Sequence, residues 1–248
     1  MGEKPRILFI LTCHRSGSSV LAYAVHTLGA SLGDNLLSAG HGNPKGHWES
    51  ASIMHLNDRL LAAGGANWTS FDFDLAKVYA NPVWHDIESD ISILLRSWTD
   101  KWPLIVIKDP RTALVWPIWR DICSVLGIEV SVLAGIRHPI AVIASLAKRD
   151  RMPMEVAALL WRRTMEDILK AQPDLVVDYD RLMAIPEKEI GRLEDRFGLL
   201  AESSEALDSF QYDFLDPNLQ RNSVPFDTAT TDAGLNRLWK LLNEMSQQ

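Results

Sequence analysis

The segment Thr12–Ser19, Thr-Cys-His-Arg-Ser-Gly-Ser-Ser, holds residue types that bind an oxyanion. Gly17 lets the backbone approach a ligand closely, and the hydroxyl groups of Ser18 and Ser19 are hydrogen-bond donors. Arg15 adds a permanent positive charge with several donors. The segment follows an apolar run and precedes an amphipathic one, so it is expected to join a strand to a helix. Because the first N–H groups of a helix have no partner within it, the sequence predicts an anion cradle here.

Two well-known phosphate-binding patterns do not fit this segment. A Walker A loop requires Gly-Lys followed by Ser or Thr, whereas Gly17 is followed by Ser18. A Gly-x-Gly-x-x-Gly pattern does not follow the apolar run either. The alternative interpretation is a tight strand–helix turn built from small residues.

Apolar runs and helical periodicities alternate along the chain. Four short apolar runs predict buried parallel strands: Arg6–Thr12, Leu104–Ile107, Glu129–Ile136 and Leu175–Val177. Helical patterns occupy Ser16–Leu28, Glu49–Ala62, Trp84–Trp98, Thr112–Leu126, Ile140–Lys148, Met154–Lys170, Pro186–Phe197 and Leu235–Met245. This alternation predicts an α/β fold of three layers, with a central, mostly parallel sheet and helices on both faces. Residues 1–248 are expected to form a single domain.

Two long segments are expected to be irregular and to serve as lids or binding loops. Gly33–Gly46 is rich in Gly, Asn and Pro. Gly64–Pro82 carries four aromatic residues, Trp68, Phe71, Phe73 and Tyr79.

The composition limits the possible partners. The net charge of −7 argues against a broad surface for nucleic acid, although a small anionic ligand needs only a few cations. Two cysteines cannot build a disulfide framework, and no apolar run is long enough to form an integral membrane segment, so a cytoplasmic location is expected. The seven histidines are scattered and no Cys-x-x-Cys occurs, so no metal site is expected.

A second possible anion contact lies at the end of the third expected strand. Arg137 follows this strand, and Ser145 lies eight residues later on the next expected helix. Pro139 suits the first turn of that helix. By itself the pair is equally well explained as an ordinary strand-end Arg and a helix Ser.

Together these two features resemble the sulfotransferases that use the donor PAPS (3′-phosphoadenosine-5′-phosphosulfate), in particular a bacterial-type branch. The first segment is similar to their T-x-x-K-S-G-T-T loop, which binds the 5′-phosphosulfate, with Arg in place of Lys. An Arg and a Ser at this interval bind the 3′-phosphate in that family. The resemblance covers roughly residues 6–222 and implies a P-loop-like sulfotransferase fold with PAPS as donor and PAP as product. The donor contacts that it implies are Arg15, Ser16, Gly17, Ser18, Ser19, Arg137 and Ser145.

Two later segments also resemble this family. Val176–Leu182 is similar to a strand ending in Tyr-Glu-x-Leu, which implies that Tyr179 lies near the donor adenine; a buried core tyrosine is the alternative. Phe214–Leu219 is similar to F-I-D-P-x-L, and Arg221 beyond it either contacts a donor phosphate or is exposed. The Gly-x-x-Gly-x-x-Lys signature of the cytosolic members is absent.

The resemblance also implies catalytic roles. Arg15 would stabilise charge on the leaving group, and Lys108 would contact the sulfuryl oxygens unless it reaches solvent. Pro110 stands where cytosolic members carry their catalytic His, so another base is needed. Glu49 is the first choice, because other branches use a Glu after the first helix.

His47 and His14 are the alternatives to Glu49 as general base. Asp109 and Arg111 are expected either to form a supporting ion pair or to touch the acceptor. The acceptor class, a sugar, lipid-like alcohol or phenol, is not predicted, nor is the oligomeric state. The competing functions are a P-loop-like nucleotide kinase or NTPase and a non-catalytic nucleotide-binding protein.

Overall fold

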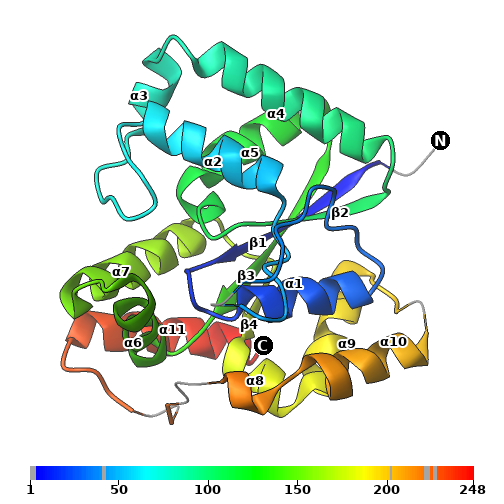
Figure 1. Cartoon of the computed structure of the whole chain (residues 1–248), viewed down its shortest axis with the longest axis vertical. Helices are drawn as coiled ribbons and strands as arrows, with labels where there is room; N and C mark the ends of the chain where they lie inside the picture. Colours follow the sequence, from blue (N-terminus) through cyan, green and yellow to red (C-terminus); the bar gives the residue numbers. More distant parts are fainter. Residues whose placement is uncertain (1–3, 41–42, 202, 221–223, 226–227) are drawn as a thin grey trace.

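The computed structural model describes residues 4–40, 43–201, 203–220, 224–225 and 228–248. The four expected strands all form: β1 Arg6–Thr12, β2 Leu104–Lys108, β3 Glu129–Ile136 and β4 Leu175–Asp178. Among the described residues they make one parallel sheet in the order β2-β1-β3-β4 (Figure 1). The predicted α/β class with a parallel central sheet is confirmed.

Because the four strands pair in parallel, their carboxyl ends lie at one edge of the sheet. β1 lies between β2 and β3, so the chain crosses from one side of β1 to the other between β2 and β3. In open parallel sheets, ligands bind outside the carboxyl ends at such a reversal of strand order. The segments that follow the four strands are therefore the ones positioned to build a site.

Alternate residues of β1 face two separate apolar cores. Phe9 belongs to a core that β1 shares with α2 (Ala51–Ala63), α4 (Trp84–Thr99), α5 (Thr112–Leu126), α7 (Met154–Lys170) and α11 (Ala233–Ser246). Ile10 faces the second core, which includes α1 (Ser18–Thr27) and α9 (Pro186–Phe197). Figure 1 shows these two groups of helices on opposite sides of the sheet, as expected for three layers.

Some elements differ from the sequence-based expectation. The predicted bounds of α5, α7 and α9 are confirmed, whereas α1 begins two residues later than predicted, and α6 spans Pro139–Asp150. Gly64–Pro82 was predicted to be irregular but contains α3 (Leu75–Ala80), because the Asp74 carboxylate accepts a hydrogen bond from Ala76 N and caps it. The short elements α8 (Tyr179–Ala184), α10 (Ser204–Asp208), η1 (Ser209–Phe214) and η2 (Pro217–Leu219) were not predicted.

In the described part of the chain, no helix combines the length and the apolar character needed to cross a bilayer.

Candidate active site

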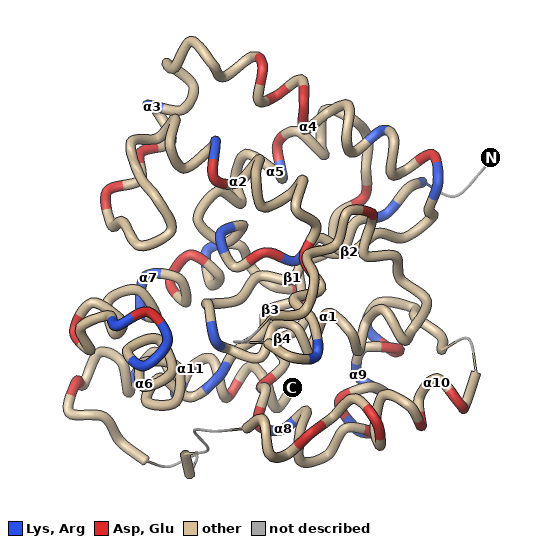
Figure 2. Tube along the Cα trace, in the orientation of Figure 1, with Lys and Arg blue, Asp and Glu red and all other residues tan. Residues whose placement is uncertain are grey.

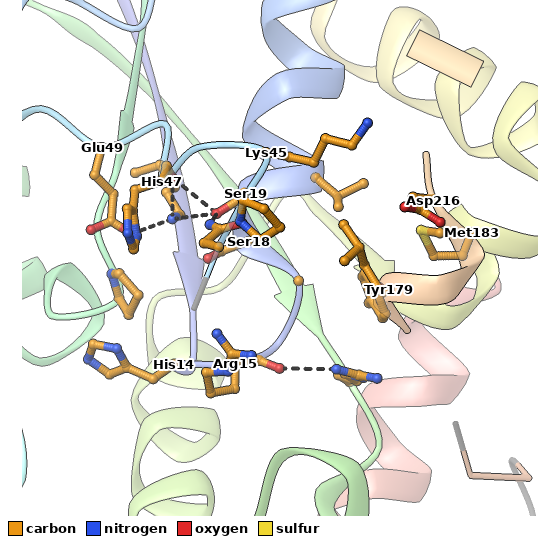
Figure 3. A pocket seen from close by; sticks show the side chains of 18 of the residues that line it. His14, Arg15, Ser18, Ser19, Lys45, His47, Glu49, Tyr179, Met183 and Asp216 are labelled. Atoms are coloured by element: carbon orange, nitrogen blue, oxygen red, sulfur yellow. Dashed lines mark hydrogen bonds and ion pairs between the residues drawn. The ribbon is translucent and has the colours of Figure 1, made fainter. Parts of the chain in front are cut away.

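The loop between β1 and α1 combines left-handed backbone angles with the uncapped start of a helix. Arg15 and Gly17 both adopt left-handed backbone angles, with φ of 68° and 80°. α1 begins at Ser18 without a side-chain cap, so its first N–H groups remain available. Gly17, Ser18 and Ser19 line a pocket (Figure 3), and the buried Ser16 hydroxyl has no hydrogen-bond partner among the described residues.

Tyr179 packs directly against this loop from the end of β4. It is the first residue of α8, one residue beyond the strand, and only 8% of it is exposed. A Cβ atom on Gly17 would lie 1.9 Å from Tyr179 Cδ2. The glycine is therefore required both for its backbone angle and for this contact.

Replacing Gly17 by alanine should destabilise the fold. The left-handed angle costs a non-glycine residue about 1–2 kcal/mol. Displacing the Tyr179 ring should add about 1–3 kcal/mol. Urea denaturation measures the total decrease in the free energy of unfolding. Gly127→Ala is the matched control, because Gly127 has a φ of 70° but nothing within 4 Å of the added atom. Equal losses in the two variants would show that the Tyr179 contact is unimportant.

The expected second anchor contacts the first. Arg15 Nε donates to Ser145 Oγ at 2.9 Å, and Arg137 Nη1 donates to the Arg15 carbonyl oxygen at 3.4 Å. The Arg137 guanidinium carbon lies 4.5 Å from the centre of the Tyr179 ring, within cation–π range. Arg137 Nε also lies 3.9 Å from Asp180 Oδ1. The residues expected from the ends of β1, β3 and β4 thus meet in one place.

Lys108 and Glu49 form a buried ion pair in the same pocket. Lys108 is the last residue of β2 and is 3% exposed, so the solvent-reaching interpretation of it is wrong. Its ammonium donates to the Glu49 carboxylate, to His47 O at 2.9 Å and to Ser19 Oγ at 3.4 Å. Glu49 was expected inside a helix but precedes Ser50, the N-cap residue of α2.

The two alternative bases also line the pocket. Burial and the nearby charges of Arg111, Arg149, Lys108 and Arg15 hold the pKa of His14 well below its usual value. Its imidazole lies 4.5 Å, centre to centre, from the Trp68 ring. His47 contributes its carbonyl oxygen to Lys108, and its ring lies beside Glu49 in Figure 3. All three candidate bases therefore belong to one site.

Asp109 and Arg111 form the expected supporting ion pair. Arg111 Nη1 lies 2.9 Å from Asp109 Oδ2, and Arg111 Nε lies 2.8 Å from Asp58 Oδ1. Burial raises the pKa of Asp109 to about 6, with Arg111 opposing the rise and Glu49 adding to it. The pair fixes the turn after Lys108, since Arg111 N also donates to Asp109 Oδ1 at 2.7 Å.

Several lining residues were not identified from the sequence. Asn43 Nδ2 donates to Ser19 Oγ at 2.7 Å, and Lys45 Nζ donates to Asp213 O at 2.7 Å, so residues 43–45 of the predicted irregular segment Gly33–Gly46 line the pocket. Met183, Arg149 and Asp216 also line it. Only Asp216 lies in a motif that could have indicated this. Arg221 lies outside the described residues.

The aromatic segment after Gly64 contributes less to the pocket than expected. Trp68 contacts the His14 ring, as described above. Phe73 instead packs against Gly64, where an added Cβ would come within 2.5 Å of its ring, and Tyr79 packs edge-on against Trp84. None of these three aromatic residues is among those that line the pocket.

Comparison with solved structures bears on the fold. The sulfotransferase domain from the Synechococcus PCC 7002 olefin synthase matches with a TM-score of 0.55 and 21% identity, over 98% of this chain and 96% of that chain. The sulfotransferase domain from the curacin biosynthetic pathway matches with a TM-score of 0.56 and 18% identity, over 98% and 99%. This chain has the fold of a sulfotransferase domain. No protein-family model and no curated protein matches the sequence, and at these identities the structural likeness concerns the fold alone.

Proposed function

We propose that this chain is a PAPS-dependent sulfotransferase of a bacterial-type branch, which transfers a sulfuryl group to a hydroxyl of a small-molecule or carbohydrate acceptor. The observation that carries the proposal is the convergence of four strand ends on one pocket. β1 supplies Arg15 and its loop, β2 supplies Lys108, β3 leads to Arg137, and β4 leads to Tyr179. The shared fold supports this proposal.

The loop and the second anchor suit the two ends of the donor. The helix N-terminus and the serines of the loop would bind the 5′-phosphosulfate. Arg137 and Ser145 would bind the 3′-phosphate, and the Tyr179 ring lies on the same side of the pocket, where an adenine could stack. The unpartnered Ser16 hydroxyl and the uncapped α1 are the donor groups that such an anion would use.

The proposed reaction is an in-line displacement at sulfur. The acceptor oxygen forms a bond to sulfur while the bond between sulfur and the bridging phosphate oxygen breaks. The bonding electron pair leaves with the 5′-phosphate, and the acceptor proton goes to the base. Arg15 would stabilise the charge on the leaving oxygen and Lys108 the charge on the sulfuryl oxygens, by hydrogen bonding.

Glu49 is the proposed base. Its carboxylate lies on the His14 side of the pocket, across Ser18 and Ser19 from Tyr179 (Figure 3). An acceptor on that side would approach sulfur opposite the nucleotide. His14 suits the role less well, because a strongly lowered pKa makes a weak base.

PAP should stabilise the protein, whereas ATP with magnesium should not. At a concentration 100 times its dissociation constant, a ligand adds about 2.7 kcal/mol to the stability. For a chain of this size that corresponds to a rise of about 5–10 °C in melting temperature. Differential scanning fluorimetry measures the rise.

Arg137→Ala tests the same proposal at the second anchor. This variant should lose most of the PAP-induced shift, whereas Arg120→Ala, which removes an exposed arginine on α5, should keep it. Stabilisation by ATP with magnesium alone would favour a kinase or NTPase. Stabilisation by PAP without sulfuryl transfer to any acceptor would favour a non-catalytic nucleotide-binding protein.

A further inference from the structure

The pocket carries more positive charge than the proposed donor contacts use. Five cationic side chains and two carboxylates line it, in a chain whose net charge is −7. These side chains are Arg15, Lys45, Lys108, Arg137 and Arg149, with Glu49 and Asp216. Three of the cations have proposed roles at the donor. Lys45 binds Asp213 O and lies near the Phe214 ring, away from His14 in Figure 3, so Arg149 is the cation that remains to be explained on the His14 side.

Arg149 lies on the side of the pocket that the acceptor would enter. It lies on α6 one turn beyond Ser145, a proposed contact of the donor 3′-phosphate, so its place in the pocket is judged from the groups around its guanidinium. The Arg149 guanidinium carbon lies 6.0 Å from the centre of the Trp68 ring. Trp68 in turn packs on His14, which is across the pocket from Tyr179 in Figure 3. The Arg149 side chain therefore lies on the proposed acceptor side of the pocket and not on the proposed adenine side.

Arg149 retains hydrogen-bonding capacity toward a ligand. Its Nε and Nη2 groups bind the neighbouring Asp150 carboxylate at 2.7–2.9 Å. A guanidinium has five N–H donors, and these contacts use two of them. The other three have no partner among the described residues, and 35% of the side chain is exposed. A free face of a guanidinium suits bidentate binding of a carboxylate or phosphate.

The His14 side of the pocket holds several cations, two of which, Arg149 and Arg111, are themselves paired with carboxylates. The charged groups that shift the pKa of His14 are all cations, with Arg111 and Arg149 ahead of Lys108 and Arg15. Figure 2 also shows Lys and Arg gathered at the end of α6. An anionic group bound here would exchange its hydration shell for contacts with cations, which favours its binding. A neutral alcohol would gain no such attraction.

We propose that the acceptor is an alcohol that carries an anionic group, and that Arg149 binds this group beside His14 while the hydroxyl faces Glu49. The inference rests on the proposed function, since it concerns the second substrate of the same site. The anionic group of the acceptor would be an oxyanion, either a carboxylate or a phosphate.

Matched pairs of small alcohols test this acceptor class. Calorimetry on the PAP-saturated protein would compare para-hydroxybenzoate with para-hydroxybenzamide, lactate with lactamide, and glycerol phosphate with glycerol. In at least one pair the anion should bind about tenfold or more tightly than its neutral partner, as expected for a charge-assisted contact. The first two pairs report on carboxylates and the third on phosphates. Product formation from labelled PAPS should show the same preference.

Arg149→Ala should remove the preference for the anion and leave PAP affinity unchanged. Arg149→Lys should keep part of the preference. Arg120→Ala is the matched control, because Arg120 also pairs with the next residue, Asp121, on an exposed helix face outside the pocket lining. Its preference should equal that of the parent protein.

The inference would be overturned if no pair showed a preference for the anion, or if the preference survived Arg149→Ala. It would also be overturned if Arg149→Ala lost PAP affinity, because Arg149 would then belong to the donor site. A parent protein that does not bind PAP would contradict the proposed function as well. A parent that binds PAP but treats acid and amide alike would contradict the acceptor class alone.

Discussion

Arg15→Ala should lower the turnover number by about 10²- to 10³-fold, the usual effect of removing one donor that stabilises charge in a transition state. The side chain belongs to the loop that would hold the 5′-phosphosulfate, and its Nε donates to Ser145 Oγ at 2.9 Å. A guanidinium that is already held in place loses little freedom when charge develops on the leaving oxygen. Initial-rate kinetics with saturating PAPS measures the effect.

Two further variants separate the charge of Arg15 from its position. Arg15→Lys keeps a positive charge and should recover part of the turnover. Ser145→Ala keeps the guanidinium but removes its partner, so it should lower PAP affinity and turnover by a smaller factor. If Arg15→Ala affects only the affinity for PAP and leaves turnover intact, the charge-stabilising role belongs to another residue.

The sequence predicted the strand–loop–helix around Gly17 and the other strands well, for a local physical reason. Buried parallel strands are continuous apolar runs, so the bounds of β1 and β3 follow from composition alone. The ends of such strands lie at one edge, which brings Arg15 and Arg137 together whatever the intervening helices do. Gly17 could be identified from sequence, but its contact with Tyr179 could not, because that depends on tertiary packing.

The rest of the pocket was harder to predict, since part of it is built by irregular backbone. Asn43 and Lys45 lie in a segment with no periodicity, and they reach the pocket through single hydrogen bonds to Ser19 and Asp213. Arg149 belongs to an ordinary amphipathic helix, and no spacing distinguishes it from other surface arginines. Which helix end faces a pocket is set by packing between elements.

Lys108 connects Ser19 of the first loop to Glu49, the proposed base. An ammonium has three N–H donors, and in this structure they are directed to Glu49, His47 O and Ser19 Oγ. To contact a sulfuryl oxygen, Lys108 must give up one of these partners. The longest contact, 3.4 Å to Ser19 Oγ, is the weakest of the three. If a sulfuryl oxygen replaced Ser19 Oγ, Lys108 would remain paired with Glu49. The Glu49 carboxylate would still have lone pairs that could accept a hydrogen bond from the acceptor hydroxyl.

Glu49→Gln should abolish most of the turnover while PAP affinity stays within about twofold, because a general base contributes about 10²- to 10⁴-fold and the amide cannot accept the proton. The substitution is nearly isosteric, so the pocket keeps its shape. It also leaves the buried Lys108 ammonium without its charged partner, which costs up to about 3–5 kcal/mol when a buried pair is broken. Urea denaturation must therefore accompany the kinetics, and turnover is compared at a temperature where PAP titration shows the variant fully folded.

His47→Ala is the control for this prediction. The structure uses the His47 carbonyl oxygen to bind Lys108, and alanine retains that carbonyl. Turnover should therefore change little in His47→Ala if Glu49 is the base. The opposite pattern, with His47→Ala inactive and Glu49→Gln active, would transfer the role to the imidazole and reduce Glu49 to an ion-pair partner that keeps Lys108 in place. Full activity in both variants would leave His14 as the base, and the cations around it would then have to be neutralised by bound substrate before it could accept a proton.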